Sequence, residues 1–184
     1  MSTTDPPKSN FWRRWIAPRI YGLTLGDWSF WVSICVGAAL VLWPLFMPVH
    51  LLRGISVESL SVAVITFTAI GLGVSVALGA LVATFPTGKL RKALQLPGEG
   101  GKPTAFAELA FVVFWAGASN LLTAAVAILA LLLAGPYSIL CSANPVPAVA
   151  SGLLCASTVY ALLQTLAALV ALLEIAGLSE KFDG

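Results

Sequence analysis

Residues 60–85 read LSVAVITFTAIGLGVSVALGALVATF and contain no charged side chain. About 20 consecutive apolar residues are enough for a helix to cross the hydrocarbon core of a bilayer, and this stretch is longer than that. Its residues do not alternate between apolar and polar, as they would in a strand of a membrane barrel. Because lipid offers the backbone no hydrogen bonds, the stretch predicts a membrane-spanning helix.

Three further apolar runs lie at about residues 30–52, 105–134 and 146–178. The whole chain is 59% hydrophobic and 10% charged, with a mean hydropathy of +0.94, whereas a soluble domain carries roughly 25% charged residues. The sequence therefore predicts an all-α membrane protein, a bundle of four transmembrane helices over residues 30–178. Residues 1–29 precede this bundle, and residues 179–184 follow it as a short tail.

The basic residues predict the orientation of the bundle. All but one of the 10 Lys and Arg residues fall on the same predicted side, the exception being Arg53 between the first two spans. Basic residues near span ends are retained in the cytoplasm. We therefore expect both termini and the 86–104 loop to be cytoplasmic, and we expect the membrane to be a bacterial inner (plasma) membrane.

The segment NFWRRWIAPRIYG, residues 10–22, interleaves aromatic and basic side chains just before the first span. Aromatic rings favour the headgroup level, and Arg contacts anionic lipid. Pro18 and Gly22 interrupt the segment, which predicts a short amphipathic interfacial anchor. Docking on a protein partner or a polyanion is the alternative; a net charge of +2 gives no reason to expect nucleic acid. The predicted anchor residues are Trp12, Arg13, Arg14, Trp15, Arg19 and Tyr21.

Enzymatic interpretations find no support in the sequence. His50 is the single histidine, and the three cysteines, Cys35, Cys141 and Cys155, form no C-x-x-C pair. Hydrolase, phosphate-loop and zinc-protease motifs are absent. We therefore expect no catalytic residue, no metal and no cofactor. Cys141 and Cys155 are expected either to remain free thiols or to form a disulfide.

Four acidic residues, Asp27, Glu58, Glu108 and Glu174, are predicted at or near span ends. Ion-coupled transporters keep carboxylates inside the membrane, so this placement argues against active ion coupling. Glu108 and Glu174 are both expected just inside the cytoplasmic interface. They either pair with basic loop residues or form a carboxylate ring around the axis of an oligomer.

One face of the 60–85 helix is made of small residues. Small residues spaced four apart let another helix approach closely, so the pattern predicts a helix contact. It does not say whether the partner helix belongs to the same chain. The predicted helix-packing residues are Thr68, Gly71, Ser75 and Gly79.

Uncharged polar residues cluster in the middle of the third and fourth spans. Amide side chains are costly against lipid, so Asn120 and Gln164 are expected to face protein or water. They either hydrogen-bond each other across the bundle or line a hydrated path. The candidates are Ser119, Asn120, Thr123, Ser157, Tyr160 and Gln164.

Two functions fit these observations. In the first, the protein is a non-enzymatic, homo-oligomeric pore or ion-channel-type subunit, with uncharged polar residues along its path. In the second, it is an accessory or assembly subunit of a larger membrane complex and acts through helix packing. The sequence does not name an ion, a partner or a trigger.

Overall fold

A computed structural model describes residues 22, 26–46, 56–84, 94–96, 104–134, 137 and 145–183. These residues form four helices: α3 (Trp28–Phe46), α4 (Val57–Thr84), α6 (Ala105–Ala134) and α7 (Pro145–Asp183). The predicted all-α class is confirmed for this part of the chain. The predicted anchor residues, Trp12 to Tyr21, lie outside the described residues, as do His50 and Cys141.

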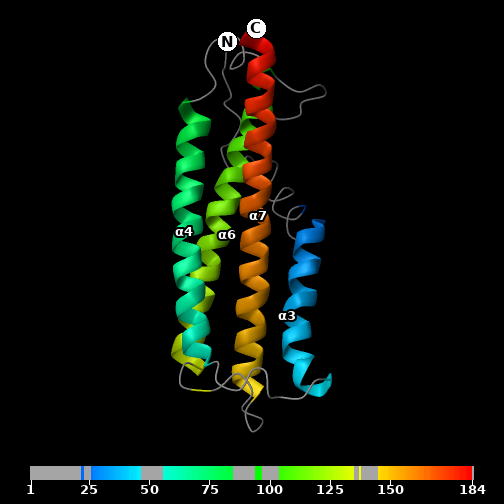
Figure 1. Ribbon diagram of the computed structural model, residues 1–184, viewed down its shortest axis with the longest axis vertical. Coiled ribbons are helices and arrows are strands. Elements are labelled where there is room, and N and C mark those ends of the chain that lie inside the picture. Colours follow the sequence, from blue (N-terminus) through cyan, green and yellow to red (C-terminus); the bar gives the residue numbers. More distant parts are fainter. Residues whose placement is uncertain are drawn as a thin grey trace, which may run out of the picture.

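Helices α4, α6 and α7 lie side by side as a three-helix bundle, and α3 packs on α7 at the side away from α4 (Figure 1). Two apolar clusters fill the bundle. One contains Val57, Ala134 and Leu154 near the end where α4 begins. The other contains Val82, Leu109 and Ala168 nearer the opposite end. Between the two clusters lies a layer of polar side chains.

Short polar side chains cap the first turns of three of the helices. The Ser59 amide donates to Ser56 Oγ (3.1 Å), the Ala107 amide to Thr104 Oγ1 (3.2 Å) and the Ser29 amide to Asp27 Oδ1 (3.2 Å). Such caps satisfy amides that lack a partner in the first turn. The Val57 amide also donates to the Tyr137 carbonyl (3.1 Å), which ties the start of α4 to the chain just after α6.

Three helices are long and apolar enough to cross a membrane, namely Val57–Thr84, Ala105–Ala134 and Val146–Gly177. The expectation of four full spans is thus met only in part. The span expected at 30–52 corresponds to α3, which ends at Phe46 and whose apolar stretch, Trp28–Leu42, is shorter. Residues 47–52 of that expected span lie outside the described residues.

Candidate functional site

The polar layer between the two apolar clusters joins α6, α7 and the first turn of α3, and α4 packs against it at Gly71. We call it the polar belt. Its side chains come from residues far apart in sequence, and several are almost completely buried. The belt consists of Asp27, Ser29, Trp115, Asn120, Thr123, Ser157, Tyr160, Gln164 and Thr165.

Asn120 of α6 is fully buried at the contact with α4 and α7. Its Nδ2 donates to the Ala116 carbonyl (2.8 Å) in its own helix and to Thr165 Oγ1 (3.0 Å) in α7. Its Oδ1 accepts no hydrogen bond from the described residues and faces Gly71 of α4, where an added Cβ would overlap the carboxamide. Gly71 therefore leaves the space that Asn120 occupies.

Gln164 of α7 is 3% exposed and reaches toward α3. Its Nε2 donates to Asp27 Oδ2 (3.1 Å) and to Ser29 Oγ (3.0 Å). Ser29 Oγ in turn donates to Asp27 Oδ2 (2.6 Å). A hydrogen bond to an ionised carboxylate is stronger than a neutral one. Asp27, which also caps α3, is thus fixed to the middle of α7.

The two amides do not bond each other, contrary to one alternative drawn from the sequence. Asn120 binds Thr165, and Gln164 binds Asp27 and Ser29. The reason is the geometry of α7, where successive side chains are rotated by about 100°. Thr165 therefore meets α6 while Gln164 meets α3. Asp27 does precede its own helix, as expected, but that helix begins beside the middle of α7 (Figure 1).

The remaining belt contacts also link helices within the chain. Trp115 Nε1 donates to the Tyr160 hydroxyl (2.9 Å), and the Tyr160 ring meets Phe30 edge-on at 6.2 Å between centroids. Thr123 Oγ1 donates to the Ser157 carbonyl (3.0 Å). The hydroxyls of Ser119 and Ser157 instead bond carbonyls of their own helices. These donors are used in contacts between and within helices, and no nucleophile–base pair is formed among them.

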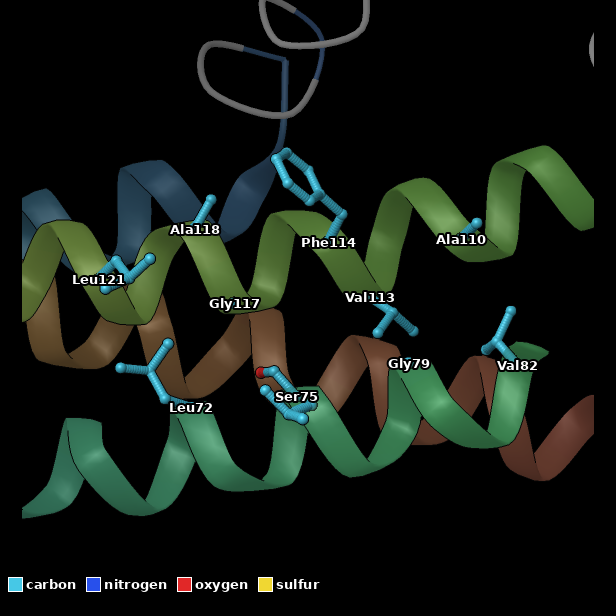
Figure 2. A pocket seen from close by; sticks show the side chains of 11 residues that line it. Leu72, Ser75, Gly79, Val82, Ala110, Val113, Phe114, Gly117, Ala118 and Leu121 are labelled. Atoms are coloured by element: carbon cyan, nitrogen blue, oxygen red, sulfur yellow. The ribbon is translucent and has the colours of Figure 1, made fainter. Parts of the chain in front are cut away.

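The small-residue face of α4 packs on α6 of the same chain. Thr68, Gly71 and Ser75 are buried, and Gly79 is half-buried. An added Cβ on Gly117 would lie 3.5 Å from the Ser75 Cβ. Toward Gly79 and Val82 the two helices leave a groove of about 420 Å³, with Val113 and Gly117 on its α6 side (Figure 2). The lining of this groove is almost entirely apolar.

A second close approach, between α3 and α7, was missed by the sequence analysis. An added Cβ on Gly37 would lie 2.6 Å from the Gly152 carbonyl oxygen and 2.8 Å from the Ala156 Cβ. An added Cβ on Gly152 would overlap Val41. A signal was present, because Ser33 and Gly37, like Gly152 and Ala156, are small residues spaced four apart.

The other predicted site residues stand apart from the belt. Glu108 is exposed near the start of α6, and Glu174 is exposed toward the end of α7. Cys155 and Cys35 are free thiols, and Cys141, the other half of the alternative disulfide, lies outside the described residues. Among the described residues, no three His, Cys, Asp or Glu side chains are placed to hold a metal ion.

The belt is therefore an arrangement that holds α3, α6 and α7 at fixed depth and rotation relative to one another, and α4 packs on it at Gly71. Comparison of the chain with protein-family models, with curated proteins and with solved structures found no match.

Proposed function

We propose that the protein is a non-enzymatic subunit of a larger complex in a bacterial plasma membrane, and that it acts through helix packing. One observation carries this proposal. The donors of the polar belt that reach across helices, from Trp115, Asn120, Thr123 and Gln164, are all bonded within one subunit. Interhelical hydrogen bonds of this kind fix helices to one another in lipid.

The outer surface supports the same proposal. Large apolar side chains are exposed along the helices, among them Ile70, Val76, Phe114 and Leu132. Lipid and neighbouring apolar helices can cover such a surface. The groove between α4 and α6 opens on this surface and is lined by small residues such as Gly79 and Gly117 together with larger apolar ones such as Phe114, so it has room for side chains of a neighbouring helix.

The pore subunit is the second candidate. It needs polar side chains on a path between subunits, but Ser119, Asn120, Thr123 and Gln164 are buried. Ser157 and Tyr160 are half-buried and take part in hydrogen bonds within the chain. Glu108 and Glu174 remain exposed at the helix ends, so a carboxylate ring in an oligomer is the form of pore that these positions would suit.

Two glycines of α4 provide a matched test. Gly79 lines the groove, whereas Gly73 has open space around its Cβ position and lies outside the groove. We expect wild-type protein and Gly73→Leu, purified in mild detergent, to retain a stoichiometric second polypeptide, and Gly79→Leu to lose it while remaining folded. Recovery of a homo-oligomer alone, which conducts ions in reconstituted vesicles, would contradict the packing role and support the pore.

A further inference from the structure

The first turn of α3 lies well below the upper ends of the other helices. With 19 residues α3 is about 28 Å long, whereas α4 with 28 residues and α6 with 30 reach about 42 and 45 Å. The start of α4 is level with the end of α6, since Val57 bonds Tyr137, and Gln164 holds Asp27 beside the middle of α7. Figure 1 shows that α3 begins beside the middle of α7, and we call the start of α3 the α3 ledge.

A flat bilayer edge fits the molecule neither at the level of Asp27 nor at the level of the upper ends of α4 and α7. With its edge at Asp27, the upper part of α4 would stand in water, although residues 76–83 carry only apolar side chains or glycine and Leu81 is 49% exposed. With its edge at the upper ends of the helices, the Asp27 carboxylate would lie in hydrocarbon, about 12–15 Å below the surface. Charged groups are costly there.

The α7 side of the bundle above α3 differs in its exposed residues from the α4 side. Above α3, the side of α7 that contacts α3 continues with small, acidic and single apolar residues, because the spacings return to one helical face. Ala167, Val170 and Glu174 on this side are exposed, and Ala171 is half-buried. Trp28 at the ledge is 67% exposed, and tryptophan favours the interface between lipid and water.

We propose that the bilayer edge is stepped around this protein. Lipid headgroups and water reach down to Asp27 at the α3 ledge and cover the adjoining face of α7, whereas acyl chains extend past Leu81 on the α4 side. Carboxylates at Asp27 and Glu174 suit water and the ammonium groups of headgroups, and a short helix thins the bilayer beside it. This inference rests on membrane embedding and is independent of the packing role.

Single cysteines at matched heights test the step. Ala167 lies about 33 Å from the start of α7, Leu81 about 36 Å from the start of α4 and Ile70 about 20 Å. All three are exposed. Each is changed to Cys in a chain whose three native cysteines are replaced by Ser, and the protein is placed in nanodiscs, where both faces are open to a charged maleimide. Each labelling rate is divided by the rate for the same variant unfolded in urea.

The step predicts that Ala167→Cys reacts at least about tenfold faster than Leu81→Cys, although Leu81 is the higher position, because maleimide needs a thiolate in contact with water. Ile70→Cys stays protected. Equal labelling of Ala167→Cys and Leu81→Cys overturns the proposal in favour of a flat edge at Asp27. Protection of both overturns it in favour of a flat edge at the upper ends. Labelling of all three, Ile70→Cys included, would refute membrane embedding itself.

Discussion

The amide of Gln164, in the middle of α7, donates a 3.1 Å hydrogen bond to the carboxylate of Asp27, which caps α3. This contact connects the shortest of the four helices to the longest. It also keeps the amide of Gln164, which is 3% exposed, out of lipid. Together with the Asn120–Thr165 bond, it fixes the rotation of α7 between α3 and α6.

The packing of Gly71 on Asn120 predicts a rescue. Gly71→Ala places a methyl group in the Asn120 carboxamide and should destabilise the protein by about 1–3 kcal/mol, as overpacked sites do. In an Asn120→Ala background that methyl group has room, so the same change should cost much less. Denaturant unfolding in detergent measures both steps. Equal costs in the two backgrounds would mean that the glycine is needed for another reason.

The close approach of α3 and α7 predicts that Gly37→Ala and Gly152→Ala each cost about 1–3 kcal/mol of unfolding free energy. The methyl group of Gly37→Ala meets the Gly152 carbonyl oxygen, a backbone atom that cannot move aside as a flexible side chain can, and the methyl group of Gly152→Ala overlaps Val41. Gly73→Ala is the matched control, since nothing lies within 4 Å of its Cβ position, and it should cause no loss. If Gly37→Ala is as stable as the control, α3 does not pack on α7 at this distance.

The bias of basic residues predicts that residues 1–29, 86–104 and 179–184 are cytoplasmic. Single cysteines replacing Ser9, Gly100 and Ser138, in a chain without native cysteines, can be tested in intact cells with an impermeant thiol reagent. Only Ser138→Cys should react from outside. Labelling of Gly100→Cys from outside would reverse the orientation.

Much of the fold follows from apolar length alone. Residues 105–134 were predicted as a span and form α6 with these bounds, and the span predicted at 60–85 forms Val57–Thr84. Lipid imposes helical structure on such segments, so composition is sufficient to find them. The start of α4 was also predictable, because Ser56 is a good cap.

The position of one helix along another was not predictable in this way. Asp27 lies at the end of its own helix, so the sequence placed it at a membrane edge. Its contact with Gln164 depends on where α3 packs along α7, and this register is set by the mutual fit of Gly37 and Gly152. The alternative in which Asn120 and Gln164 bond each other is not observed, since partners of buried amides depend on helix rotation rather than on residue type.

A double-mutant cycle on Asp27 and Gln164 tests the central claim most directly, namely that the polar belt joins helices within one subunit. The cycle uses Asp27→Ala, Gln164→Leu and the double variant, with unfolding free energies measured in detergent and Thr66→Val as a control whose hydroxyl bonds only its own helix. Interhelical hydrogen bonds in membrane proteins average about 0.6 kcal/mol and reach about 1.7 kcal/mol. We predict a coupling free energy in this range, because each single change removes the same contact. Strictly additive effects, with each single variant as stable as Thr66→Val, would contradict the account.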